Sequence, residues 1–259
     1  MSKPLMIQTF FRDGGTKESL ENDFAITVKA HPRHPNLWHL KYDQLESPFA
    51  NHMVRECRGI ILDIDDNFRV VSRAFDKFFN FGEGHADEID WQTARVLEKV
   101  DGSLCVVYWY ADEWHVATTG TASGSGNVGP NRDLTFAQYF WQTFESVAGQ
   151  QWARSPNCLY PELGSDRDCC YYFELTGPLN RVVIPHQKPS ITLLGGRHIP
   201  TQQEIAASEI DSAFTGCVPV VKEYSLSSVD DICRSFDNIS PLSQEGYVVV
   251  DSQFRRIKI

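Results

Sequence analysis

The residues best suited to chemistry are grouped around Lys99, in the run Glu98-Lys99-Val100-Asp101-Gly102-Ser103. A lysine that is desolvated beside other cations can release a neutral amine, which is a nucleophile. The alternative is structural, because Asp-Gly between two apolar runs is typical of a β-hairpin and would leave Lys99 solvated. On this run alone the hairpin is favoured. The functional interpretation of Lys99 therefore depends on residues elsewhere in the chain.

Cations and aromatic rings occur in two runs upstream of Lys99. Arg58 stands at the start of an apolar run, and Lys77 directly precedes Phe78 and Phe79. Cationic side chains can neutralise phosphate oxygens, and an aromatic ring can stack on a base. These runs could form a nucleotide pocket, although at least one of the two phenylalanines is expected in the core.

Two acids and two further cations lie in apolar runs downstream. Glu174 interrupts one apolar run and Glu245 precedes another, and each could serve a ribose hydroxyl, a cation, a metal ion or a structural salt bridge. Arg256 and Lys258 alternate with apolar residues, so they share one face of a strand. That face could hold a triphosphate, or it could be simply solvated.

Strand-like runs rich in β-branched and aromatic residues dominate the elements that must position these side chains. Predicted strands are Cys57–Ile64, Phe68–Arg73, Val96–Val100, Ser103–Tyr110, Trp114–Thr119, Cys170–Thr176, Arg181–Ile184, Ile191–Gly195, Val218–Glu223, Gly246–Asp251 and Phe254–Ile259. Helical spacing predicts Leu134–Val147, capped by Asp133, and two short helices near Thr201–Ile210 and Ser227–Phe236. A Gly- and Ser-rich loop, Gly120–Arg132, is expected to lie over the site. Strands without regular helical alternation indicate an α+β fold with mainly antiparallel sheets.

Net charge, cysteine content and hydropathy limit the classes of protein to which this chain can belong. The 259 residues carry a formal net charge of -10, so a nucleic acid would have to meet a local basic groove rather than a basic surface. Seven cysteines without a C-x-x-C spacing predict reduced, mostly buried thiols rather than a disulfide framework or a zinc site. Neither a signal peptide nor a membrane span is indicated, which favours a cytoplasmic protein forming one folded unit over residues 1–259.

Together, in this order, these runs resemble the phage-type RNA ligase 1 family within the covalent nucleotidyltransferases, which include DNA ligases and mRNA capping enzymes. The resemblance extends from about Tyr42 to the last residue. It is carried by Glu56-Cys57-Arg58-Gly59, Lys77-Phe78-Phe79-Asn80, Lys99-Val100-Asp101-Gly102-Ser103, Phe173-Glu174, Asn180-Arg181-Val182-Val183, Glu245-Gly246-Tyr247-Val248 and Arg256-Ile257-Lys258.

The resemblance implies a nucleotidyltransferase fold with a nucleotide pocket between its sheets. It also implies that Lys99 takes up AMP from ATP, that AMP passes to an RNA 5′-phosphate, and that a 3′-hydroxyl then displaces AMP. By the same resemblance Arg58 and Lys77 bind phosphates, Glu174 binds the ribose, and Tyr42 and Phe79 lie by the nucleotide. Lys258 and Arg256 would grip the α-phosphate. A magnesium ion is expected with ATP, and Glu245 is the candidate ligand.

Three departures from the family pattern keep alternatives open. Arg256 stands where the family usually has lysine, and Thr119 stands where a basic residue is common. No C-terminal domain for RNA selection follows Lys258, and no obligate protein partner is indicated. The alternatives are another covalent nucleotidyltransferase, of the DNA ligase or capping type, or an RNA-end binding module with impaired catalysis.

Overall fold

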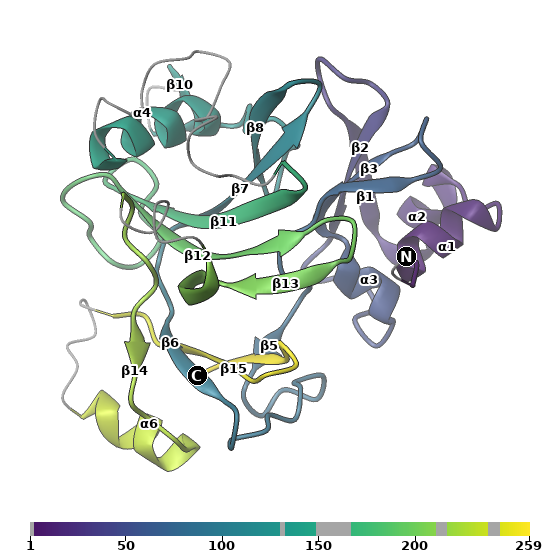
Figure 1. Cartoon of the computed structure of the whole chain (residues 1–259). Coiled ribbons are helices and arrows are strands. Elements are labelled where there is room, and N and C mark those ends of the chain that lie inside the picture. The colour runs from purple at the N-terminus through teal and green to yellow at the C-terminus, as the bar shows by residue number, and fades with distance from the viewer. Residues whose placement is uncertain (1–2, 130–132, 149–166, 211–216, 238–243) are drawn as a thin grey trace.

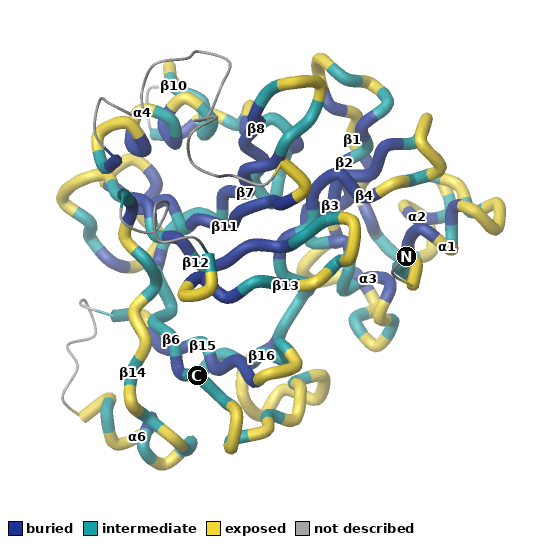
Figure 2. The backbone as a smooth tube through the Cα atoms, in the orientation of Figure 1, coloured by how far each residue is buried: buried dark blue, intermediate teal, exposed yellow. Residues whose placement is uncertain are grey.

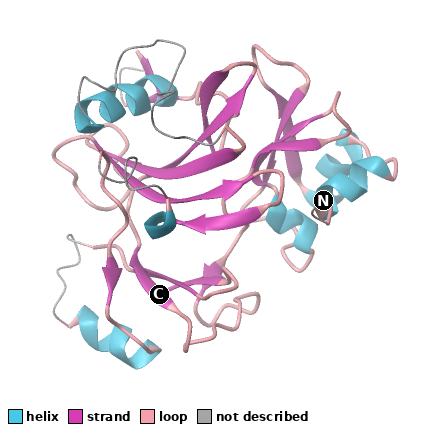
Figure 3. Ribbon diagram, in the orientation of Figure 1, coloured by secondary structure: helices cyan, strands magenta, loops and turns pink. Residues whose placement is uncertain are grey.

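The computed structural model describes residues 3–129, 133–148, 167–210, 217–237 and 244–259. Strands form three main sheets, and the helices lie at the periphery of the molecule (Figures 1 and 3). The strand interiors are buried, whereas the connecting turns are exposed (Figure 2).

The N-terminal sheet is an antiparallel meander in the order β1-β2-β3-β4. Its strands are β1 (Ile26–Ala30), β2 (Leu37–Tyr42), β3 (Arg58–Asp63) and β4 (Arg69–Ser72). Three helices pack with it, namely α1 (Met6–Arg12), α2 (Lys17–Phe24) and α3 (His52–Glu56). The Glu56 carboxylate accepts hydrogen bonds from the backbone N–H groups of Met6 and Ile7, which satisfies unpaired donors at the start of α1.

The central sheet has the antiparallel order β13-β12-β11-β7-β8. Its strands are β7 (Ser103–Tyr110), β8 (Glu113–Thr118), β11 (Cys169–Thr176), β12 (Ser190–His198) and β13 (Gln203–Ala206), with a 3-10 turn, η2 (Ala207–Glu209), after β13. The helix α4 (Phe136–Ala148) covers one face, where the rings of Phe140 and Phe144 lie 5.4 and 6.1 Å from that of Phe173. A small ladder of β9 (Asn127–Val128) and β10 (Leu134–Thr135) precedes α4.

The C-terminal sheet has the order β14-β6-β15-β16-β5. Its strands are β5 (Phe79–Asn80), β6 (Arg95–Glu98), β14 (Glu223–Tyr224), β15 (Tyr247–Val250) and β16 (Arg256–Lys258), and only the β5–β16 pair is parallel. The helix α6 (Val229–Phe236) packs on it through the fully buried Ile232. The predicted α+β class with mainly antiparallel sheets is confirmed.

The Asp101-Gly102 pair does not form a hairpin turn. The strand before it, β6, belongs to the C-terminal sheet, and the strand after it, β7, belongs to the central sheet. The segment from Lys99 to Gly102 therefore crosses from one sheet to the other. The hairpin interpretation of this run is wrong, because turn propensity does not tell with which sheet each flanking strand pairs.

Two other predicted elements are wrong for tertiary reasons. Thr201–Ile210 is not a helix, because residues 203–206 pair as β13 with β12. Arg181–Ile184 is not a strand, because the backbone N–H groups of Val183 and Ile184 donate to the buried Asp101 carboxylate, at 2.7 and 2.5 Å. Val218–Glu223 is mostly irregular, with a single bridge from Val220 to Leu193.

The predicted helix starting at Leu134 begins two residues later, and Thr135 rather than Asp133 caps it. The Thr135 hydroxyl accepts from the Gln138 backbone N–H at 3.2 Å, and the Gln138 side chain accepts from the Thr135 N–H at 2.9 Å. The predicted helix Ser227–Phe236 is confirmed as α6, with Ser228 as its cap. Residues 130–132 of the Gly- and Ser-rich loop lie outside the described residues.

Candidate active site

A cavity of about 560 Å³ lies between the central and C-terminal sheets and reaches the edge of β2 and β3. Its volume is within the range of small-molecule sites. The charged residues that line it, among those described, are Lys41, Arg58, Lys99, Arg256 and Lys258 with Glu98 and Glu174. The cavity is thus a local basic site in an acidic protein.

Lys99 enters this cavity because its segment crosses between the sheets. Asp101, two residues on, is 4% exposed and anchors the crossing to the backbone of Val183 and Ile184. Gly102 passes so close to the Leu175 carbonyl of β11 that a Cβ atom would clash with it. The Lys99 amine forms an ion pair with Glu245, which directly precedes β15.

Arg58 and Lys258 approach the same cavity from different sheets. The Arg58 guanidinium carbon and the Lys258 amine lie 5.1 and 5.2 Å from the ring centroid of Phe78. Arg58 Nη1 is buried without a hydrogen-bond partner among the described residues. A buried N–H donor costs free energy unless it donates a hydrogen bond to a ligand or to water. Arg58 is therefore suited to bind an anionic ligand.

The cationic surroundings change the protonation of Lys258. Burial, with Lys77, Arg58 and Lys99 nearby, lowers the pKa of Lys258 to about 8. A lysine half-protonated near pH 8 is drawn back to the charged form by a phosphate group. Lys258 therefore has the electrostatic properties of a phosphate-responsive group.

Glu174 is the acid at the cavity wall on β11. Desolvation, only partly offset by Arg58 and Lys99 and reinforced by Glu245, raises the pKa of Glu174 to about 8. At neutral pH this carboxyl group is therefore protonated and can donate a hydrogen bond. Such a group suits a hydroxyl oxygen better than an unscreened metal ion.

Arg256 lines the cavity but is already bound to a carboxylate. Its two terminal nitrogens donate to the two oxygens of Glu204 on β13, and its guanidinium lies 4.5 Å above the ring of Phe75. Arg197 on β12 also donates to Glu204, at 3.0 Å. Glu204 therefore joins two arginines across the boundary between the two sheets.

Four of the predicted site residues do not line the cavity. Lys77 donates to the Gln44 side chain at 3.0 Å and lies 5.5 Å above the Tyr42 ring, and both Tyr42 and Phe79 are buried. Burial and the nearby Arg58 lower the pKa of Lys77. Glu245 does not line the cavity, and it contacts the cavity residue Lys99 through an ion pair. Phe78, rather than Phe79, takes the place in the cavity wall.

Sequence reasoning missed Lys41, Phe75 and the pair Glu204 and Arg197. Lys41 follows an alternating pattern in β2, which was not predicted as a strand. Phe75 stands in the same run as Lys77, so the spacing could have pointed to it. Glu204 was missed because Thr201–Ile210 was predicted as a helix, whereas Glu204 lies opposite Arg197 in the β12–β13 pair and meets Arg256 only in the folded chain.

Comparison with solved structures establishes the class of fold, which is that of the nucleotidyltransferases. The chain is similar to an archaeal ATP-dependent RNA ligase, at a TM-score of 0.59 and 12% identity, covering 98% of this chain and 64% of that one. It is also similar to a putative ATP-dependent DNA ligase from Aquifex aeolicus, at a TM-score of 0.56 and 15% identity, covering 93% and 60%. These identities support the fold alone.

Sequence comparison establishes the family. The model of the RNA ligase family matches residues 56–259, so the chain belongs to that family. It is 30% identical over 245 residues to an RNA ligase of Rhodothermus phage RM378, covering 76% of this chain and 54% of that protein. It is 29% identical over 261 residues to a putative bifunctional polynucleotide kinase/RNA ligase of Autographa californica nuclear polyhedrosis virus, covering 95% and 35%. The chain thus spans about half or less of these relatives' length.

Proposed function

We propose that this chain is the adenylyltransferase part of an ATP-dependent RNA ligase, which joins RNA 5′-phosphate and 3′-hydroxyl ends in RNA repair or tRNA-break sealing. The observation that supports this most is the position of Lys99 in a cavity with Arg58 and Lys258. The family to which the chain belongs supports RNA as the substrate.

In the first step, the Lys99 amine attacks the α-phosphorus of ATP. A P–N bond forms, the P–O bond to the β-phosphate breaks, and pyrophosphate leaves. The amine must be neutral when it attacks, so its proton passes to solvent, and we propose that Glu245, its ion-pair partner, orients it. Arg58 and Lys258 stabilise the charge that accumulates on the phosphoryl oxygens.

In the second step, an RNA 5′-phosphate oxygen attacks the adenylate phosphorus, so that a P–O bond forms and the P–N bond breaks, and the Lys99 amine leaves with a proton taken from solvent. The RNA 3′-hydroxyl then attacks the adenylated 5′-phosphate, and AMP is released. Glu174, which is protonated at neutral pH, donates to a ribose hydroxyl throughout. Tyr42, Lys77 and Phe79 then act indirectly, since they pack behind the cavity wall.

A divalent cation fits this site as a companion of ATP. Magnesium is usually bound by one or two carboxylates together with phosphate oxygens. Glu245 and Glu98 offer such oxygens near Lys99, and Glu245 remains our candidate ligand. Magnesium would supply further charge neutralisation at the triphosphate.

We propose that residues 1–259 form a single adenylyltransferase domain. Among the described residues, no helix is long and apolar enough to cross a membrane. We propose a cytoplasmic location, supported by the buried cysteines Cys57, Cys105 and Cys170, which are free thiols.

The test is adenylation with ATP labelled at the α-phosphate and magnesium. Wild-type protein should retain acid-labile label, Lys99→Ala should retain none, and Lys41→Ala, a cavity cation without a proposed nucleophilic role, should still be labelled. Label on Lys99→Ala would refute the assignment.

The alternative functions are tested by offering other substrates. GTP offered beside ATP tests the capping alternative, and nicked DNA offered beside single-stranded RNA tests the DNA-ligase alternative. Binding of 5′-phosphorylated RNA without label would favour the impaired binding module, which the pairing of Arg256 with Glu204 motivates.

A further inference from the structure

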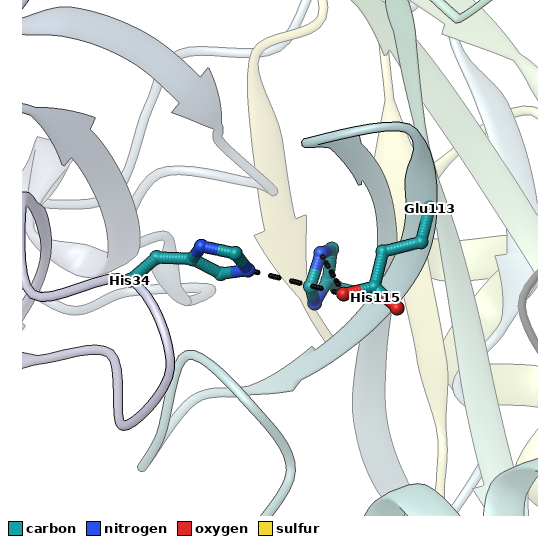
Figure 4. A group of neighbouring side chains, drawn as sticks. All are labelled: His34, Glu113 and His115. Carbon is teal, nitrogen blue, oxygen red and sulfur yellow. Dashed lines mark ion pairs between the residues drawn. The ribbon is translucent and has the colours of Figure 1, made fainter.

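A second group of reactive side chains lies apart from the cavity, where the turn after β1 meets the hairpin of β7 and β8. His34 comes from that turn, and Glu113 and His115 come from β8 (Figure 4). One ligand atom from each of the three lies within 4.8 Å of the others. His34 Nε2 and His115 Nε2 lie 3.8 and 3.5 Å from the same oxygen of Glu113.

Burial holds two imidazoles here neutral, those of His31 and His115, and neutral imidazole is the form that binds metals. Burial, with His115, His34 and Arg33 nearby, lowers the pKa of His31 to about 4. Burial also lowers the pKa of His115. The rings of His31, His34 and His115 lie 4.9 to 5.3 Å apart. Like charges at that spacing would repel, so further protonation is disfavoured.

Two buried histidine nitrogens lack a hydrogen-bond partner among the described residues. They are His34 Nε2, within the group, and Nε2 of the neighbouring His31. The His31 residue is 1% exposed, and its Nδ1 accepts the backbone N–H groups of Arg33 and His34, each at 3.1 Å. Its proton therefore lies on Nε2, a donor with nothing to donate to. His34 Nε2 can serve as an acceptor or as a metal ligand. Of these two nitrogens only His34 Nε2 can bind a cation, because His31 Nε2 carries the proton of its ring.

His115 has the hydrogen bonding of a metal ligand. Its Nε2 lies 3.1 Å from the Tyr110 carbonyl, to which it donates, so Nδ1 keeps its lone pair. Metal-binding histidines usually donate their other N–H to such a carbonyl. Arg33 Nη2 lies 3.4 Å from that Nδ1 and 2.6 Å from the Glu113 carboxylate. A cationic nitrogen thus already occupies the place between two of the ligands.

We propose that His34, Glu113 and His115 bind a zinc-type divalent cation, which displaces the Arg33 guanidinium. Two imidazoles and one carboxylate suit zinc and similar transition metals, and not magnesium or calcium. Ligand atoms of a tetrahedral zinc ion are about 3.3 Å apart, and here His34 Nε2 lies 3.8 Å from a Glu113 oxygen, with all three ligand atoms within 4.8 Å of one another. The Arg33 side chain is 61% exposed and can swing into solvent, whereas the ligands are largely buried. The metal would fasten the N-terminal sheet to the central sheet.

The test is titration of the metal-free full chain with zinc chloride, followed by calorimetry and by thermal unfolding. We expect one zinc per chain and a higher melting temperature in zinc. His34→Ala and Glu113→Gln, which change partly exposed side chains, should each weaken binding by more than about tenfold and abolish the thermal shift. Arg33→Ala should instead bind zinc more tightly, because it removes the competing cation.

Matched controls exclude other zinc ligands. His198→Ala removes a histidine bonded to Thr201, and Cys233→Ser removes the exposed thiol, so neither should change the titration. Lys99→Ala should also bind zinc normally, which separates this site from the proposed ligase reaction. The proposal is overturned if His34→Ala and Glu113→Gln bind zinc as wild type does, or if Arg33→Ala binds it no better. In that case the group is a structural ion pair of Arg33 and Glu113 among packed rings.

Discussion

Arg256 and Glu204 form a two-point ion pair across the boundary between the C-terminal and central sheets. Arg197, only 8% exposed at its side chain, shares the same carboxylate. Because Arg256 and Lys258 lie on one face of β16, this contact also sets the position of Lys258 in the cavity. Arginine, with its fork of donors, makes such a contact where lysine would offer a single point.

Glu204→Gln should therefore lower the free energy of unfolding by about 3 kcal/mol, because it leaves two largely buried guanidiniums without a counter-charge. Urea unfolding measures this change. The control is Asp66→Asn, which breaks an exposed pair with Arg69 and should cost less than about 1 kcal/mol. Equal costs for the two variants would show that Glu204 contributes no more than a surface pair.

Locally determined parts of the fold could be predicted from the sequence. The strand Ser103–Tyr110 matches β7 at both ends, because the seven residues after Ser103 are all β-branched, aromatic or otherwise apolar and turn residues flank the run. Pairing partners could not be predicted in the same way. Residues 203–206 contain helix-forming types, yet their pairing with β12 and the contact between Glu204 and Arg197 determine a strand.

In the candidate site, too, residue types and their order could be predicted, whereas contacts between distant positions could not. The types and order of Lys99, Arg58, Glu174 and Lys258 indicated a nucleotide pocket, and all four line one cavity. Which of two adjacent phenylalanines faces the cavity could not be predicted, because β5 is only Phe79–Asn80 and so short a run gives no alternation pattern to read. The ion pair of Lys99 with Glu245 was also missed, since it joins positions that meet only in the folded chain.

Phe78 and Phe79 should respond differently to truncation. Phe78→Ala should weaken ATP binding about tenfold, since the ring supports both Arg58 and Lys258. Phe79→Ala, at a residue only 5% exposed, should instead lower the free energy of unfolding by about 3 kcal/mol. Equilibrium binding and urea unfolding on both variants provide the comparison. The opposite assignment of effects would place Phe79 at the nucleotide.

Binding of a triphosphate should be accompanied by proton uptake near pH 8. Lys258 and Glu174 both have pKa values near 8, so each is about half-protonated there, and phosphate charge raises both. Calorimetry of an α,β-methylene ATP analogue in buffers of different ionisation enthalpy measures the uptake. The number of protons taken up should decrease toward pH 6.5, and the affinity for the ATP analogue should fall as the pH rises above 8. Lys258→Arg should remove part of the uptake, and an unchanged value would mean that Lys258 is not near the phosphates.

Glu174 should make the protein less stable as pH rises. Its pKa is raised from 4.5 unfolded to about 8 folded, so between these values the folded state holds a proton that the unfolded state lacks. The free energy of unfolding therefore falls with pH across this window, and no further above it. Glu174→Gln has no such proton, so its stability relative to wild type should increase from pH 4.5 to 8 and then stay constant. Urea unfolding at a series of pH values measures the difference, with Glu145→Gln on exposed α4 surface as the control without a trend. A stability advantage that shrinks as pH rises would mean that Glu174 is ionised in the folded protein and held by Arg58 as a salt bridge.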